Sequence, residues 1–439
     1  MTGGFWRKAA SFHTGCWLLL ALLKLGAQSE PAPEIQADLL AKADSVLESV
    51  SRLSGLPIHD NVSIEFKDRD FFANYYASRL QAQYSPARQA AVEKAYVLLG
   101  FLSPGENLIQ TYLDSFLNSV QGYYDPDQKT LVLADWADPE SQEMTMAHEL
   151  THALQDQSFP LDSYFTQVPN ETMDSEFAQS SLVEGQAVLV AAEYWAQRNS
   201  QAFIRPSGVI ELADPESLGK SMDDSTWETM GAKGAIDFPY VYGPVFLKAC
   251  FKKRNGKDLS WLFKNPPTTT QQIMHPQDFV SGQKESRWRE PAEWGEAGLK
   301  GYSKFWEDSM GEYGLFLVLR QYLEDDEAWK AVDGWRGDRV RAYENTESGQ
   351  KVLAGSVLMK DPVSAKLFFK SYGKLLAGKY GKFKKLNSAD AVEWFEISPG
   401  GNQVYLERLG RRIIFAEGIP AADTGAVRQA LFDTKPEKN

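Results

Sequence analysis

His148, Glu149 and His152 are the residues of this chain whose types and spacing are best suited to chemistry. Residues four apart on an α-helix lie about 40° apart around its axis, so the two imidazoles project from one face. Two imidazoles placed in this way can bind one Zn²⁺ through ring nitrogens at about 2.0–2.1 Å. Glu149 is turned by about 100° and can reach a water in the metal's open position without becoming a ligand. The pattern predicts a zinc site with a general base beside it; the alternative is an ordinary amphipathic helix.

A catalytic zinc ion usually has three protein ligands and one water, so the site needs a third ligand. The next histidine is His275, far along the chain, which leaves a carboxylate as the natural choice. The following helical segment offers three candidates: Glu176, Glu184 and Glu193. Glu184 is preferred because small apolar residues share its face and Gly185 lets its helix approach the helix of the histidines, whereas Glu193 faces the opposite way. We predict Glu184 as the third ligand, with a solvated helix acid as the alternative.

Hydrolysis through a tetrahedral intermediate also needs a hydrogen-bond donor for the developing oxyanion. Tyr240 and Tyr242 are candidates because residues 237–244 are expected to form a loop that enters a helix. His275 is the third candidate, since it lies between a helix start and Pro276. Buried aromatic side chains and a capping histidine are the alternatives for these three positions.

Asp156 lies four residues after His152 and is expected to accept an N–H from a ligand imidazole, as outer partners of metal-bound histidines do. An exposed acid at the end of the helix is the alternative.

Residues 148–156, followed by residues 184–187, resemble the gluzincin metallopeptidases, which pair the His-Glu-x-x-His motif with a glutamate on the next helix. Three further segments resemble a poorly characterised family of exported bacterial zinc-peptidase-like proteins: residues 121–126, 269–276 and 334–339. This resemblance covers most of the chain, roughly from Ser103 to Phe415. It implies a zincin-like metallopeptidase fold and one catalytic zinc ion, without a known substrate.

Hydrophobic periodicity places these residues among helices. Helical spacing runs from residue 34 to about residue 120, and after a turn at 123–127 a β-like run covers residues 130–134. Helices are predicted over residues 141–157 and 173–198. The strand before the first of these is expected to be a sheet edge to which an extended peptide adds main-chain hydrogen bonds.

Beyond about residue 302 strands and helices alternate less regularly, which is typical of an α+β domain. Helices are predicted at 311–323 and 362–377, a polar loop at 334–339, and strands at 351–358, 391–397, 403–408 and 412–415. We therefore predict a mainly helical α+β protein in four parts: a signal peptide (1–27), a helical N-terminal region (28–120), a zincin-like metallopeptidase domain (121–300) and a smaller C-terminal α+β domain (301–439).

The first 27 residues have the pattern of a signal peptide. Arg7 and Lys8 precede the apolar run 16–23, and Ala27 is a small residue at a plausible cleavage point. The apolar run is shorter than the roughly 20 residues that span a bilayer. We predict an exported protein, periplasmic or secreted, with no stable membrane insertion after cleavage. An uncleaved N-terminal anchor is the alternative.

The net charge and composition of the chain limit the kinds of molecule that it is expected to bind. With 46 Lys+Arg against 59 Asp+Glu the formal net charge is −13, so a nucleic-acid partner is not expected. Hydrophobic residues make up 43% of the chain, which excludes wholesale disorder. Two cysteines cannot form a disulfide framework, and Cys250 is expected to be a small buried residue.

The leading hypothesis is an exported zinc-dependent peptidase that acts on a peptide or protein substrate with Glu149 as general base. Two alternatives remain. One is a non-catalytic exported zinc-binding scaffold that binds protein or cell-envelope polymer through its C-terminal domain. The other is a zinc hydrolase of a non-peptide amide or ester, because the same residues serve both reactions.

Overall fold

The computed structural model describes residues 33–117, 120–167, 172–198, 230–254, 259–282, 301–381, 384–389, 392–396, 401–423 and 425–427. The predicted signal peptide lies outside them. The chain divides into two compact units. Unit 1 comprises residues 1–89, 105–171 and 175–283; unit 2 comprises residues 90–104, 172–174 and 284–439. The four-part division and its boundaries stay predictions.

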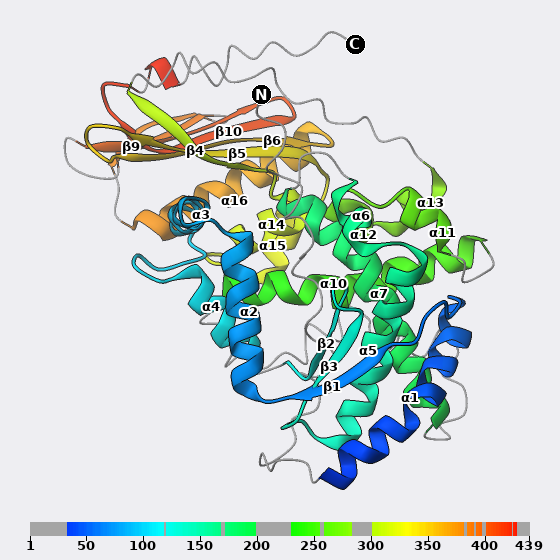
Figure 1. The fold of residues 1–439 in the computed structure, drawn as a ribbon. Helices are drawn as coiled ribbons and strands as arrows, with labels where there is room; N and C mark the ends of the chain where they lie inside the picture. Colours follow the sequence, from blue (N-terminus) through cyan, green and yellow to red (C-terminus); the bar gives the residue numbers. More distant parts are fainter. Residues whose placement is uncertain are drawn as a thin grey trace, which may run out of the picture. The chain divides into compact units, whose positions relative to one another are not determined.

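A three-stranded sheet organises unit 1 (Figure 1). Its order is β1 (Ser63–Lys67), β3 (Thr130–Ala134), β2 (Gly122–Asp125). β1 runs parallel to β3, whereas β2 and β3 form an antiparallel hairpin. The prediction of residues 130–134 as a sheet edge is therefore wrong, because β1 pairs with the other side of β3. β1 itself was not predicted, since the segments around it have helical periodicity.

Side chains alternate along β3 and so contribute to two separate cores. Leu131 and Leu133 belong to the apolar cluster formed with α1 (Pro33–Ser54) and α5 (Pro139–Ser158). Val132 and Ala134 belong to an aromatic cluster that also holds Tyr123 of β2 and side chains of α2 (Arg69–Gln83) and α4 (Leu108–Leu117). Helices thus cover both faces of the sheet, and this explains why every residue of β3 is buried.

Helix α5 carries the His-Glu-x-x-His motif. It begins where the Asp138 side chain accepts a hydrogen bond from the Ser141 N–H, with Pro139 in the first turn, where a missing N–H costs nothing. Its apolar stripe packs into the cluster with α1 and β3, and consists of Met146, Ala147, Leu150 and Leu154. The predicted helix at 141–157 is confirmed with two residues added at its start and one at its end.

Helices α7 (Met173–Arg198) and α10 (Met230–Arg254) pack backbone to backbone at two glycines. A Cβ on Gly185 would lie 2.5 Å from the carbonyl carbon of Gly243, and one on Gly243 would lie 2.3 Å from the oxygen of Ser181. Only glycine fits at these two positions. Gly185 therefore brings α7 against α10, and the expectation that it serves the approach to the helix of the histidines is wrong.

The prediction of a loop over residues 237–244 is also wrong, because Pro239 and Pro244 lie inside α10. Proline in a helix interior usually costs about 3 kcal/mol, which is why the sequence favoured a loop. Tertiary packing offsets this cost: Phe238, Phe246 and Leu247 of the same helix are fully buried. Cys250 is buried, as expected.

Four short helices complete the described part of unit 1: α6 (Leu161–Thr166), α11 (Ser260–Lys264), α12 (Thr270–Met274) and α13 (Pro276–Ser281). Helix α3 (Pro86–Leu99) begins in unit 1 and continues in unit 2 from Ala90.

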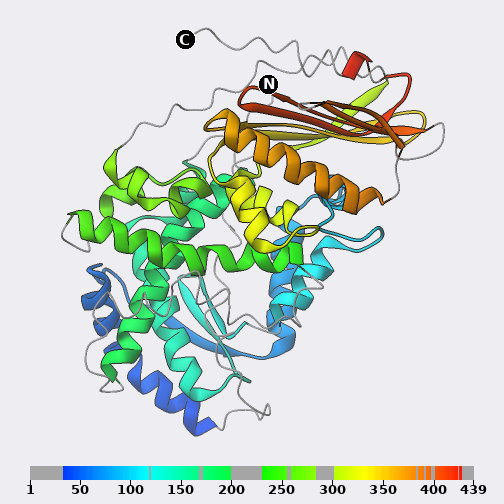
Figure 2. The ribbon, with the colours of Figure 1, turned by 180° about the vertical axis from the view of Figure 1, so that it is seen from behind.

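Unit 2 contains a seven-stranded antiparallel sheet of order β4-β5-β6-β10-β9-β8-β7. The strands are β4 (Tyr302–Asp308), β5 (Trp335–Asn345), β6 (Lys351–Met359), β7 (Lys384–Ala389), β8 (Val392–Glu396), β9 (Asn402–Leu409) and β10 (Arg412–Pro420). Helix α16 (Pro362–Tyr380) packs on β6, β9 and β10, and is the orange helix along the sheet in Figure 2.

The polar loop predicted at residues 334–339 is instead the start of β5. Its charged residue Asp338 is buried and accepts hydrogen bonds from the backbone N–H groups of Met310 and Gly311 and from the Trp335 indole. The two backbone donors stand at the beginning of α14 (Gly311–Leu319), which α15 (Asp325–Val332) follows. In the sequence alone, a buried polar residue that accepts hydrogen bonds from the start of a helix cannot be distinguished from a polar residue of a surface loop.

The described residues confirm the predicted class, a mainly helical α+β protein. None of the helices in the described ranges combines the length and the apolar character that a membrane span requires.

Candidate metal centre

Three donor atoms converge between α5 and α7 in unit 1. Nε2 of His148 and Nε2 of His152 lie 2.9 Å apart, and Oε2 of Glu184 lies 3.2 Å from the first and 3.4 Å from the second. All three side chains are at most 3% exposed. Ligands of one zinc ion at about 2.0–2.2 Å can be no more than roughly 4.4 Å apart, so this donor set fits a single ion. The roles of these residues as zinc ligands stay a prediction.

The electrostatics of the three groups are coupled. Burial works against protonation of His152, but the charge of Glu184, the hydrogen bond to it, the charge of Glu149 and the hydrogen bond to Gln155 together outweigh burial and raise the pKa of His152 to about 9. Burial likewise works against ionisation of Glu184, but the charge of His152 and hydrogen bonds from both rings hold its pKa below the usual value. The carboxylate thus stays ionised at neutral pH, as a metal ligand must be.

The other glutamates of α7 lie elsewhere. Glu176 and Glu193 are only partly buried, and neither belongs to the group of donors around the two histidines. The choice of Glu184 from its neighbours therefore agrees with the geometry of the described residues.

Gln155 is a polar partner of the site that the sequence analysis missed. Its Oε1 lies 2.8 Å from Nδ1 of His152, and its Nε2 donates to the carbonyl oxygen of Val183 and to Oε1 of Gln186. The signal was available in the spacing, because a residue three positions after His152 shares its helix face. A glutamine is a less common partner of a metal-bound histidine than a carboxylate, so the residue types favoured the neighbouring Asp156.

Asp156 does not contact a ligand imidazole in the way that was expected. Its Oδ2 accepts hydrogen bonds from the Tyr124 hydroxyl (2.9 Å) and from Nζ of Lys129 (2.6 Å), and its Oδ1 accepts the Leu161 N–H (3.1 Å). The acid is 5% exposed, so the alternative of an exposed helix-end acid fails too. Asp156 joins α5 to the β2–β3 hairpin and to the start of α6.

Glu149 is held by the same hairpin. Its Oε2 accepts the backbone N–H of Tyr124 at 2.9 Å, and Glu149 is buried. The register of the hairpin explains this contact. The N–H of Ala134 donates to the Gln121 oxygen, so residues 121 and 134 form a hydrogen-bonded pair of the hairpin. Hydrogen-bonded and non-hydrogen-bonded pairs alternate along an antiparallel ladder, which makes Tyr124 and Leu131 a non-hydrogen-bonded pair. The N–H of Tyr124 therefore points away from β3, toward α5. β2 is therefore the outer strand on this side of the sheet, although all four of its residues are buried.

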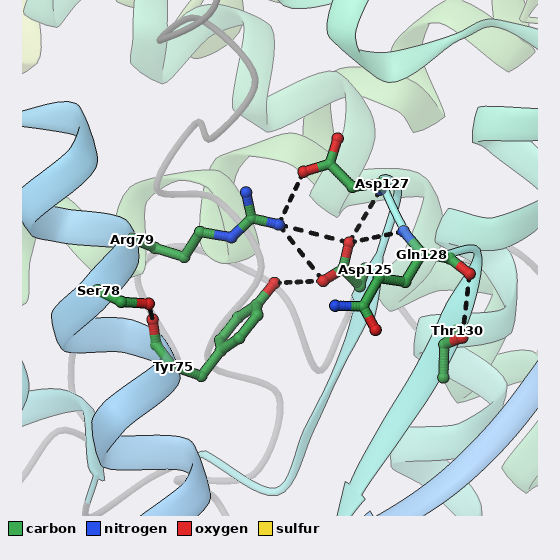
Figure 3. Close-up of polar contacts among 7 residues, drawn as sticks. All are labelled: Tyr75, Ser78, Arg79, Asp125, Asp127, Gln128 and Thr130. Carbon is green, nitrogen blue, oxygen red and sulfur yellow. Dashed lines mark hydrogen bonds and ion pairs between the residues drawn. The ribbon is translucent and has the colours of Figure 1, made fainter.

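The turn of the hairpin is tied to α2 through a buried carboxylate (Figure 3). Asp125 accepts hydrogen bonds from the Tyr75 hydroxyl at 2.8 Å and from the guanidinium of Arg79. It also accepts the N–H groups of Asp127 and Gln128, which close the turn. Burial, reinforced by the charge of Asp125, raises the pKa of Tyr75 above its usual range, so its hydroxyl stays a donor. The strand that orients Glu149 is thus fixed at its turn.

The three oxyanion candidates occupy different places. Tyr240 lies against the site: its ring is stacked at 6.2 Å from the ring of His148, and it is 9% exposed. Tyr242, two residues further along α10, stacks on Phe238 instead, with ring centroids 4.8 Å apart. His275 ends α12 and precedes α13, and is not among the donors grouped with His148.

Two stretches of the chain match known family models. Residues 107–194, which include the motif, Gln155 and Glu184, match the IrrE N-terminal-like domain of peptidase family M78. Residues 302–428 match a domain of unknown function (DUF8575). Comparisons with curated proteins and with solved structures gave no match. Over residues 107–194 the chain therefore contains a metallopeptidase-like domain.

Proposed function

We propose that this chain is a zinc-dependent peptidase of the gluzincin type, with His148, His152 and Glu184 as ligands and Glu149 as general base. One observation carries the proposal: two imidazoles and one carboxylate, all buried, bring their donor atoms within 3.4 Å of one another, with a second buried acid one residue from the first histidine. Three protein ligands leave a position open for water or substrate, which distinguishes catalytic from structural zinc sites.

A bound zinc ion would supply a Lewis acid that polarises the substrate carbonyl and lowers the pKa of a water. The chain's own residues would do the rest. Glu149 would take the proton of the attacking water and pass it to the leaving amine, and the Tyr124 N–H keeps its carboxylate in place for both transfers. Tyr240, stacked beside the ring of His148, is the donor that we propose for the oxyanion.

We further propose that the enzyme is exported and acts on peptide or protein substrates. The support for export is the charge and hydropathy pattern of residues 1–27. The support for a peptide substrate is the similarity of residues 107–194 to a peptidase family.

The test compares wild type with Glu149→Gln and Tyr240→Phe in zinc-loaded protein, using casein and a broad peptide library. Wild type should hydrolyse peptide bonds. Glu149→Gln should bind zinc equally well and lose about 10²–10⁴ in rate. Tyr240→Phe should lose about 10²–10³ in kcat with zinc affinity unchanged. Wild type that binds zinc stoichiometrically but cleaves nothing would favour a non-catalytic zinc-binding scaffold, and activity only on amide or ester libraries would favour a non-peptide hydrolase.

A further inference from the structure

One buried amide connects both helices of the candidate metal centre. The side chain of Gln155 is fully buried on α5, and its three hydrogen-bond partners are His152 on the same helix and Val183 and Gln186 on α7. Val183 directly precedes Glu184 in the chain. The amide therefore contacts one candidate ligand and the backbone next to another.

The chemistry of these partners fixes which way the amide points. A main-chain carbonyl can only accept, so the atom of Gln155 that lies 2.9 Å from the Val183 oxygen must be Nε2. The atom that lies 2.8 Å from Nδ1 of His152 is then Oε1, which can only accept. The flipped amide would place two oxygens against each other in a buried site, at the full desolvation penalty of both.

The orientation of the amide in turn fixes the histidine. Because Oε1 only accepts, Nδ1 of His152 must carry the hydrogen, and the lone pair of the neutral ring is then on Nε2. Nε2 is the atom that faces His148 and Glu184. The tautomer and the ring orientation that a metal ion requires are set by the protein itself.

We propose that Gln155 is a positioning residue of the zinc site: it holds His152 in the Nδ1–H tautomer and ties that ring to the segment of α7 that presents Glu184. This inference rests on the proposed function, since it assumes that the site binds zinc.

The second ring is held differently. Nδ1 of His148 is buried and has no hydrogen-bond partner among the described residues. This ring is positioned by neighbouring rings: Tyr240 lies stacked beside it, and His152 meets it edge-on at 4.6 Å. Removal of Gln155 should therefore act on His152 and on the segment of α7 that presents Glu184, and should leave His148 in place.

The experiment measures the zinc affinity of the mature protein, residues 28–439, by competition with a chromophoric chelator, for wild type and three variants. Q155M removes all three hydrogen bonds at nearly constant volume. Q155E keeps an acceptor for His152 but places an oxygen against the Val183 carbonyl. Q157M is the matched control, because Gln157 lies on the same helix and its amide binds the backbone of His59 and Asp60 instead.

Q155M should weaken zinc binding by about 10–100-fold, as loss of an outer partner of a metal-bound histidine typically does. Q155E should retain more affinity than Q155M, and Q157M should match wild type. Cobalt-substituted Q155M should also show an altered d–d spectrum. Folded Q155M with wild-type zinc affinity, or Q157M that loses as much as Q155M, would overturn the proposal.

A measurement on the wild type covers the case in which Q155M fails to fold. The sequence has five histidines, so ¹⁵N-histidine spectra of the zinc-loaded protein contain few signals. H59Q and H275Q variants identify two of them, and NOEs between the Nδ1 proton and the Gln155 side chain distinguish His152 from His148. His152 should show a slowly exchanging proton on Nδ1. A proton on Nε2 would refute the inference even if zinc binds. Absence of zinc binding in wild type would refute the proposed function instead, so the two failures are distinguishable.

Discussion

At the scale of single residues, Tyr124 contributes to the candidate site in two ways. Its backbone N–H binds Glu149, and its hydroxyl binds Asp156. Burial, together with the charge of Asp156, raises the pKa of Tyr124, so that the hydroxyl remains a donor. Asp156 also binds Lys129 in the hairpin turn. These contacts hold the strand whose amide orients the proposed general base.

Substitution at Asp156 should therefore slow hydrolysis while leaving the metal in place. Asp156→Ala leaves the Tyr124 hydroxyl and the Leu161 N–H without their acceptor, which should cost about 1–3 kcal/mol of the free energy of unfolding for each buried donor. Peptide turnover should fall because Glu149 loses its fixed position. Urea unfolding, zinc affinity and kcat measured on one preparation check this.

Tyr124→Phe is the control for this prediction, since it removes the hydroxyl and keeps the backbone N–H that binds Glu149. Its effect on stability should be about 1 kcal/mol. Loss of zinc affinity in Asp156→Ala as large as the loss of activity would contradict the separation of the two roles.

The convergence of His148, His152 and Glu184 could be predicted because helix spacing and residue type are local properties of the sequence. The spacing of Gln155 from His152 was visible in the sequence, but its partners on α7 were not. Tyr124 could not be assigned a role in this way, because only the packing of the hairpin against α5 brings its N–H to Glu149. Asp156 shows the same limit: its residue type suggested an imidazole partner, whereas the hairpin supplies its partners.

At the scale of elements, the contact of α7 with α10 depends on two glycines. A Cβ on Gly243 would lie 2.3 Å from the oxygen of Ser181, a backbone atom that cannot move aside cheaply. Because Ser181 and Gly185 flank Glu184 on α7, displacement of α10 disturbs the helix that carries the third candidate ligand.

Gly243→Ala should accordingly lower the free energy of unfolding by more than the about 1–3 kcal/mol typical of overpacking, and should weaken zinc binding. Differential scanning calorimetry and chelator competition are the measurements. Gly425→Ala is the control, because a Cβ there meets nothing within 4 Å. Equal stability of Gly243→Ala and wild type would contradict the close packing.

Elements whose hydrophobic residues follow a single clear period were predictable: β3 and α7 have the predicted bounds. Two kinds of element were not. β1 is a five-residue strand whose burial is incomplete, so its periodicity is weak beside that of the surrounding helices. The proline-containing part of α10 has a sequence that favours a loop, and buried packing outweighs this preference.

At the scale of the whole molecule, the mainly helical α+β class follows from the hydrophobic periodicity and from the change of pattern near residue 302, while the seven-stranded sheet of unit 2 does not. Its pairing joins strands far apart in sequence, such as β6 and β10. Its outer strand β4 contains a bulge and was not foreseen. Pairing order depends on tertiary contacts that no local window contains.

Unit 2 should lose stability as pH rises, because it holds a partly buried acid, Asp308, at the end of β4 and beside a helix start. Burial raises the pKa of Asp308 to about 7. Hydrogen bonds from the N–H groups of Met173 and Ser309 lower this pKa. The charge of Asp338 raises it and the charge of Arg339 lowers it. An acid with a raised pKa binds more protons in the folded than in the unfolded chain between about pH 4 and 7. The free energy of unfolding therefore falls as pH rises through that window, by on the order of 4 kcal/mol.

Asp308→Asn keeps the shape and the acceptor for both N–H groups but cannot ionise. The urea midpoint of wild type should fall between pH 5 and pH 8, and that of the variant should fall less. Asp338, whose pKa burial also raises, supplies the remaining slope. Identical pH dependence in wild type and Asp308→Asn would contradict this explanation.

The most direct test of the account is zinc binding by the purified mature protein, with Glu184→Ala and Glu193→Ala as a matched pair on one helix. Metal analysis after equilibrium dialysis should give one zinc per chain for wild type and for Glu193→Ala. Glu184→Ala should lose more affinity than the about 10–100-fold that removal of an outer partner costs. A wild-type protein that retains no zinc, or a Glu184→Ala variant that binds it as tightly as Glu193→Ala, would contradict the assignment of His148, His152 and Glu184 as zinc ligands.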